Sequence, residues 1–106
     1  MLPNKITFID LFAGCGGLSE GFLQTGKFEA LAHVEWEMPM VNTLRHRLVT
    51  KWGHKPDDAV KKVIHFDIQK TEELINGNWN PDTASLYSKT NHQTIINNGL
   101  KGLIGG

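Results

Sequence analysis

The sequence predicts an α/β fold in which about four parallel strands form a sheet with flanking helices. Four runs rich in aliphatic, β-branched or aromatic residues lie at 6–12, 28–34, 60–66 and 100–104. Segments with helical spacing of apolar residues separate them, and glycines or polar residues mark their ends. Strands that alternate with helices form parallel sheets joined by right-handed crossovers. The 106 residues are enough for one small domain or for part of a larger one.

The first unit is a strand, a glycine-rich turn and a helix. The run 6–12 is almost continuously apolar, which is typical of a strand buried on both faces of a parallel sheet. The run 13–17 then reads Ala-Gly-Cys-Gly-Gly, where a sharp turn is expected. Residues 18–25 show helical spacing, and Gly26 is placed to end that helix.

The remaining elements follow from the same signals. A strand is expected over 28–34 and a helix from Pro39 to Trp52, with Gly53 ending it. Further expectations are a loop at 55–58, a strand at 60–66, a short helix at 71–75, a polar loop at 76–82, a helix at 90–98 and a fourth strand at 100–104.

Composition excludes several classes of protein. Eleven basic residues balance eleven acidic ones, so the net charge of zero gives no electrostatic footprint for nucleic acid, and any DNA contact must be local or lie elsewhere. One cysteine excludes a disulfide framework and a four-cysteine zinc site. The five histidines are scattered, so no metal site is expected. No membrane span and no signal peptide are recognisable, and a cytoplasmic location is expected.

Candidate binding residues follow the strands, because ligands of parallel sheets bind at the carboxyl ends of the strands. The glycine turn lets a ligand approach the backbone, and the helix after it favours an anionic group; a tight turn without a ligand is equally compatible. Glu35 follows the second strand, where nucleotide sites place the acceptor for ribose hydroxyls, and Trp36 can stack on a base. The alternative is a solvated acidic loop with Trp36 in the core.

Asp67 and Ile68 follow the third predicted strand. The Asp67 carboxylate can accept a hydrogen bond from an exocyclic amine, and the aliphatic side chain of Ile68 can cover the face of a base. Asp67 is equally suited to be a helix N-cap. Together Asp10, Glu35 and Asp67 put carboxylates at three successive strand ends. A single ligand with an amine, a ribose and an adenine would use all three.

Three motifs carry a resemblance to a known family. The run 8–22, with Asp-Leu-Phe-Ala-Gly leading into Gly-x-Gly-Gly, closely resembles the first motif of the DNA cytosine-C5 methyltransferases. The run 34–37, Val-Glu-Trp-Glu, is similar to the second motif, with Glu37 where aspartate is usual. Phe66-Asp67-Ile68 looks like the third, with Phe66 where glycine is common. The resemblance covers 5–68 well, is thin across 69–99 and returns at 101–106.

The resemblance implies a Rossmann-like S-adenosylmethionine-dependent methyltransferase fold, present incompletely, with the first strand between the second and the fourth. It implies that the glycine turn holds the methionine part of the cofactor, that Glu35 takes the ribose hydroxyls and that Trp36 stacks on adenine. The implied cofactor-binding residues are Asp10, Phe12, Ala13, Gly14, Cys15, Gly16, Gly17, Glu35, Trp36, Asp67 and Ile68.

We therefore expect residues 1–106 to be an amino-terminal, cofactor-binding fragment of such an enzyme, without its target recognition domain. The family's nucleophile lies in a Pro-Cys-Gln motif that this sequence does not contain, and Cys15 in the cofactor turn is no substitute. We expect no catalytic residue and no activity in the isolated chain. The complete enzyme would methylate cytosine in a short duplex DNA target, as part of a bacterial restriction–modification system.

Alternatives stay open. The chain would instead be a non-catalytic module that holds the cofactor or a related nucleotide, or one subunit of a split methyltransferase that a complementary chain completes. An NAD-linked oxidoreductase is a weaker alternative, because the Gly-x-Gly-Gly spacing and Trp36 do not match that class.

Overall fold

The computed structural model describes residues 5–11 and 17–104. Within them, β1 (Ile6–Asp10), β2 (Phe28–Glu35) and β3 (Val63–His65) form one sheet in the order β1-β2-β3, and both pairings are parallel. The helices are α1 (Gly17–Gln24), α2 (Met38–Thr50), α3 (Pro56–Lys62), α4 (Thr71–Asn76), α5 (Pro81–Tyr87), the 3-10 helix η1 (Ser88–Thr90) and α6 (Gln93–Ile104). The predicted α/β class and parallel sheet are confirmed.

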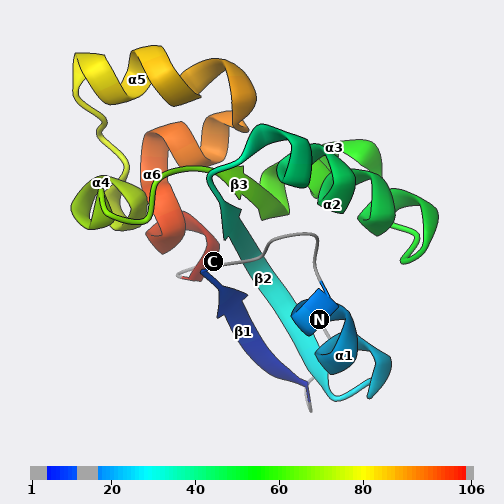
Figure 1. The fold of residues 1–106 in the computed structure, drawn as a ribbon. Coiled ribbons are helices and arrows are strands. Elements are labelled where there is room, and N and C mark those ends of the chain that lie inside the picture. The colour runs from blue at the N-terminus through cyan, green and yellow to red at the C-terminus, as the bar shows by residue number, and fades with distance from the viewer. Residues whose placement is uncertain (1–4, 12–16, 105–106) are drawn as a thin grey trace.

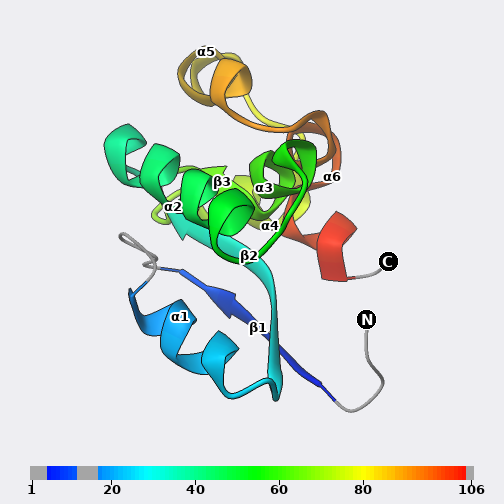
Figure 2. The same ribbon diagram turned by 90° about the vertical axis from the view of Figure 1, so that its right-hand side faces the viewer.

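The helices form a layer on each side of the sheet. Helices α1, α2 and α3 lie on one side, and α4, α5 and α6 lie on the other (Figures 1 and 2). Two buried clusters hold the layers together. One joins α2 and α3 to β3 through Val41, Leu44, Leu48, Ala59 and Val63. The other joins α4 and α6 to β2 and β3 through Ala32, Val34, Ile64, Phe66, Leu74, Ile95 and Leu100.

Strand β2 is central, and its side chains serve both layers. Ala32 and Val34 enter the cluster below α4 and α6, whereas His33 and Glu35 point to the opposite face because side chains alternate along a strand. The register shifts between Phe8 and Ile9, so that Leu31 is an extra residue of β2. Such a bulge twists the pair locally and sets which β2 side chains face each layer beyond it.

The environment of β1 differs from the prediction. Its residues are exposed or half-buried, with Ile6 60% exposed, so the expectation of a strand buried on both faces is wrong. The expectation that this strand lies between the second and the fourth is also wrong for the part of the chain that the structure describes, since β1 pairs with β2 alone there. An edge strand has one side without a pairing neighbour, which leaves its side chains more open to water.

The predicted fourth strand is wrong as well, because 100–104 belongs to α6. The last segment of α6 starts after Gly99, whose φ of 61° and ψ of −159° break the helix. Beyond that break, Leu100 is buried and Leu103 packs beside it against the same cluster. Residues three apart share a helix face, so the apolar run serves a helix as readily as a strand.

Other boundaries shift more modestly. The predicted loop at 55–58 contains the start of α3, with Pro56 in its first turn, and the third strand begins at Val63 rather than at residue 60. Helix α5 occupies 81–87, so the predicted polar loop at 76–82 is wrong for residues 81 and 82. The predicted helix at 90–98 starts later, at Gln93, as part of α6. The helices near 18–25, 39–52 and 71–75 are confirmed as α1, α2 and α4. None of the helices within the described ranges has the length and apolar character needed to cross a membrane.

Candidate functional site

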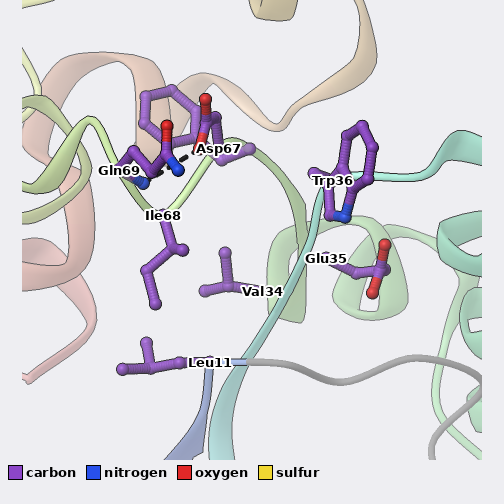
Figure 3. Close-up of a pocket in the computed structure, with 8 residues that line it drawn as sticks. Leu11, Val34, Glu35, Trp36, Asp67, Ile68 and Gln69 are labelled. Atoms are coloured by element: carbon purple, nitrogen blue, oxygen red, sulfur yellow. Dashed lines mark hydrogen bonds between the residues drawn. The ribbon is translucent and has the colours of Figure 1, made fainter.

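A pocket of about 370 Å³ opens where the three strands end (Figure 3). It receives side chains from the end of β1, from the end of β2 and from the segment after β3. Its lining residues are Leu11, Val34, Glu35, Trp36, Phe66, Asp67, Ile68 and Gln69. The volume lies in the range of small-molecule sites in proteins. Residues predicted from separate strand ends thus line one cavity.

Glu35 contributes a carboxylate that is nearly buried. It is the last residue of β2 and is only 8% exposed, so the alternative of a solvated acidic loop is wrong for this side chain. Its Oε2 accepts the backbone N–H of Glu37 at 2.6 Å. This bond folds the chain tightly between β2 and α2 and orients the carboxylate at the pocket wall. A charged acceptor held in a pocket of low exposure is suited to bind hydroxyl or amine donors.

Trp36 presents its indole to solvent beside that carboxylate. The side chain is 65% exposed, so the alternative that it packs in the core is wrong. Figure 3 shows the indole at the pocket above Glu35. An exposed aromatic face at the mouth of a pocket is a stacking surface for a flat ring.

Asp67 and Ile68 form the opposite wall, directly after β3 and Phe66. One carboxylate oxygen of Asp67 accepts the Gln69 N–H at 2.9 Å, and the Asp67 carbonyl accepts the Lys70 N–H at 3.0 Å. The N-cap of α4 is Lys70, so the N-cap alternative for Asp67 is wrong; its side chain closes the turn before the helix. Ile68 points toward Leu11 and Val34, which makes this side of the pocket apolar (Figure 3).

The first strand contributes less to the cavity than predicted. Leu11, rather than Asp10, lines the pocket, and Asp10 is the register partner of His33 in the sheet. Gly17 is the first residue of α1. The other predicted residues of the glycine turn, Phe12, Ala13, Gly14, Cys15 and Gly16, lie outside the residues that the structure describes.

Burial sets the protonation of groups around the site. The pKa of His33 falls from 6.5 to about 4, mainly because the ring is buried, while the Asp10 carboxylate opposes this change. Burial likewise lowers the pKa of His65. The pKa of Tyr87 is raised by burial and by the negative charge of Asp67, and its ring packs on Phe66 of the pocket lining with 4.8 Å between the ring centroids.

Sequence reasoning missed two sets of residues. Leu11, Val34, Phe66 and Gln69 line the pocket, and their signal was their position beside predicted site residues. The second set is Asn91 and Arg45, which bond the backbone of β3 along its outer edge, and no local sequence pattern indicates this role. The side-chain amide of Asn91 accepts from the His65 N–H at 2.9 Å and donates to the His65 carbonyl at 2.7 Å, as a neighbouring strand would.

Arg45 completes that edge. Its guanidinium donates to the Val63 carbonyl at 2.7 Å and to the Thr90 carbonyl at 2.8 Å. The side chain is half-buried, and both of its partners are backbone carbonyls. Within residues 5–11 and 17–104, no three His, Cys, Asp or Glu side chains gather as a metal site would require.

Comparison with known proteins decides the family. The model of the C-5 cytosine-specific DNA methylases matches residues 6–97, which include every element from β1 to η1 and the first five residues of α6. The chain belongs to the C-5 cytosine-specific DNA methylase family. The resemblance inferred from the three motifs is thereby confirmed.

Curated relatives agree with this assignment. Type II methyltransferase M.HgiGI of Herpetosiphon aurantiacus is 49% identical over 69 residues, which are 65% of this chain and 54% of that protein. Type II methyltransferase M.HgiDI of the same organism is 60% identical over 35 residues, 33% of this chain and 11% of that protein. DNA (cytosine-5)-methyltransferase 1 of Gallus gallus is 46% identical over 41 residues, 39% of this chain and 3% of that protein.

The relatives are longer than this chain. The chain spans about half the length or less of the curated relatives named above. No solved structure matches it. Members of this family are methyltransferases that act on DNA and use S-adenosylmethionine as the methyl donor. The three-stranded parallel sheet is consistent with a methyltransferase fold.

Proposed function

We propose that this chain supplies the S-adenosylmethionine-binding part of a DNA cytosine-C5 methyltransferase. One observation carries the proposal: the Glu35 carboxylate, the exposed Trp36 indole, and Asp67 with Ile68 line the same pocket at the carboxyl ends of β2 and β3. In α/β folds this is the edge at which nucleotides bind. Had these residues lain on different sides of the molecule, the proposal would have had no support.

The chemistry of the pocket fits the adenosyl part of the cofactor. Glu35 would accept hydrogen bonds from the ribose hydroxyls, and the Trp36 indole would stack on the adenine ring. Asp67 would accept from the adenine amine, and Ile68 would cover the ring. The glycine turn at 14–17, which includes Cys15, would hold the methionine part, and Phe12 would pack on the cofactor. Asp10 and Ala13 complete the proposed cofactor-binding set. The bound cofactor supplies an electrophilic methyl group.

Catalysis needs a nucleophile in addition. The 106 residues contain no Pro-Cys-Gln run, so these residues would bind and orient the methyl donor and would not attack the base. We further propose a duplex DNA substrate and a restriction–modification setting, which the names of the Herpetosiphon relatives support. A cytoplasmic location stays a prediction from the sequence.

Titration calorimetry with S-adenosylmethionine and with its demethylated product tests the binding proposal. Trp36→Ala should weaken binding roughly 5- to 150-fold, because stacking on one base contributes about 1–3 kcal/mol. Glu35→Gln should weaken it roughly 10- to 100-fold through loss of charge-assisted hydrogen bonds. Trp36→Phe, which keeps a ring, and Glu72→Gln, on the exposed face of α4, are the matched controls. Absence of wild-type binding, or equal binding by all variants, would contradict the proposal.

A complementary methyltransferase chain is the partner we propose for β1. In the described part of the sheet, β1 pairs only with β2, and an apolar groove of about 320 Å³ lies beside it between β1, α4 and α6. Its lining residues are Ile9, Leu11, Ile68, Thr71, Leu74, Ile75, Leu100 and Ile104. A strand of a second chain that pairs with β1 would cover this groove.

Mixing this chain with one that begins at the Pro-Cys-Gln motif tests the partner proposal. Methyl transfer to duplex DNA is expected only when both chains are present. Ile104→Asp in the groove should reduce that activity, whereas Leu86→Asp, at an equally exposed position on α5, should not. Absence of transfer at saturating cofactor would count against a split enzyme.

A further inference from the structure

The imidazole of His65 connects two separate parts of the chain beside the pocket. Its Nε2 lies 2.9 Å from the carbonyl oxygen of Trp36, at the end of β2. Its Nδ1 lies 2.8 Å from the hydroxyl of Thr90, in η1. A carbonyl oxygen can only accept, so Nε2 carries the hydrogen in this arrangement. The ring thereby connects Thr90 in η1 to the backbone of Trp36, whose indole is exposed.

The far end of this connection rests on a fixed frame. Asn91 holds both backbone groups of His65, and Arg45 joins the carbonyl of Thr90 to that of Val63. These contacts bind η1 firmly to β3. Thr90, whose carbonyl is held by Arg45, therefore has a defined position from which its hydroxyl meets Nδ1.

The near end is the short turn between β2 and α2. Oε2 of Glu35 holds the N–H of Glu37, and Nε2 of His65 holds the carbonyl of Trp36. Both polar groups of the Trp36–Glu37 peptide are thus anchored by side chains, and the carbonyl of the peptide before Trp36, that of Glu35, accepts the Phe66 N–H at 3.1 Å. Because the indole is 65% exposed, little packing around the ring itself can define its direction. The orientation of the indole depends instead on the backbone from which it projects.

The protonation state of His65 suits this contact. Burial lowers the pKa of the imidazole, and the nearby Arg45 guanidinium lowers it further, whereas the contact with Trp36 and the Glu35 carboxylate raise it. A neutral ring with hydrogen on Nε2 donates to Trp36 and accepts the single Thr90 hydroxyl hydrogen at Nδ1, over the 2.8 Å contact, in place of the Tyr87 carbonyl at 3.2 Å. Both ring nitrogens then have partners of the correct kind.

We infer that His65 is a positioning residue for the pocket: its Nε2–H bond to the Trp36 carbonyl fixes the backbone that directs the indole, and so sets how the pocket accepts a flat base. This inference rests on the proposed function. His65 itself is not among the lining residues of the pocket, so its effect passes through Trp36.

Two substitutions separate the roles of the two ring nitrogens. Gln places its amide N–H near the position of Nε2, whereas Asn reaches only the position of Nδ1. His65→Gln should bind the demethylated cofactor product within about twofold of wild type. His65→Asn should bind it roughly 2- to 10-fold more weakly, as expected for loss of one hydrogen bond. A residue that merely supports the fold would not distinguish the two variants in this direction.

A spectroscopic measurement accompanies calorimetry on the full chain. With 5-fluorotryptophan incorporated, Trp36→Phe identifies the ¹⁹F resonance of residue 36. That resonance should shift in His65→Asn and stay in His65→Gln, while the resonance of Trp79, which donates to the Glu73 carbonyl and packs on Phe66, reports that the fold is intact.

The outcomes distinguish this inference from the proposed function. If wild type does not bind the product, the proposed function fails, and the ¹⁹F resonance of residue 36 alone decides the role of His65. If wild type binds and both variants bind equally, the inference is overturned and the proposed function stands. An unchanged residue 36 resonance in His65→Asn also overturns it.

Discussion

Acidification is expected to destabilise this protein through His33, in the middle of β2. The ring is fully buried, and burial lowers its pKa from 6.5 to about 4. The Asp10 carboxylate opposes that change, and Lys62 and His54 add to it. The folded chain therefore keeps His33 neutral at pH values where the unfolded chain has already taken up a proton.

The sign and size of the effect follow from this difference in pKa. The unfolded state binds more protons between pH 6.5 and about 4, so the free energy of unfolding decreases as the pH falls through that window. The interval is about 2.5 pH units, and each unit corresponds to about 1.4 kcal/mol, which makes a loss of about 3.5 kcal/mol. Above pH 6.5 and well below pH 4 the contribution of His33 is constant. A loss of this size is a large fraction of the stability of a small domain.

Urea unfolding across pH 3.5–8, followed by circular dichroism, measures the effect. His33→Gln should flatten the pH dependence by up to about 1.4 kcal/mol per pH unit between 4 and 6.5 relative to wild type. His46→Gln, at an exposed position on α2, should leave it unchanged. An NMR titration of the His33 ring in wild type gives the pKa without any substitution. A His33→Gln variant with the full wild-type slope, or a ring that titrates near 6.5 in the folded protein, would refute the reasoning.

Three further substitutions test the packing that supports the site. Gly99→Ala should lower the free energy of unfolding in urea by about 2 kcal/mol or more, because a Cβ there would lie 2.5 Å from the Gly77 nitrogen and the backbone conformation of Gly99 is one that only glycine adopts readily. The control is Gly21→Ala in α1, where an added Cβ meets nothing within 4 Å. Leu74→Ala should lower the free energy of unfolding by about 2–5 kcal/mol, because it leaves a cavity in the core, whereas Leu86→Ala at an exposed position should lower it by less than about 0.5 kcal/mol. Equal shifts of the melting temperature in the two variants would contradict this prediction. Asn91→Ala should cost about 1–3 kcal/mol and speed amide hydrogen exchange at His65, since both backbone groups of His65 lose their partner; unchanged exchange would exclude the edge role.

The sequence by itself determined the order of the principal elements and the location of the candidate site. Continuous apolar runs, helical stripes and glycine stops are local signals, and they predicted β2, α2 and α4 closely. Glu35 and Asp67 were predicted to meet because the carboxyl ends of parallel strands lie at one edge of a sheet. That geometric rule needs no side-chain detail, and both residues do line one pocket.

Only the tertiary structure decided which apolar segments pair and which pack. The run 100–104 suits a strand or a helix equally, and burial of Leu100 against the cluster below α4 selects the helix. With no fourth strand in the described sheet, β1 is an edge and is more open than its apolar sequence predicted. The closure of β3 by Arg45 and Asn91 joins residues 18 and 26 positions from their partners, which no local pattern encodes. Each of these features depends on burial and hydrogen bonds between segments that are far apart in the sequence, and those contacts form only when the chain folds.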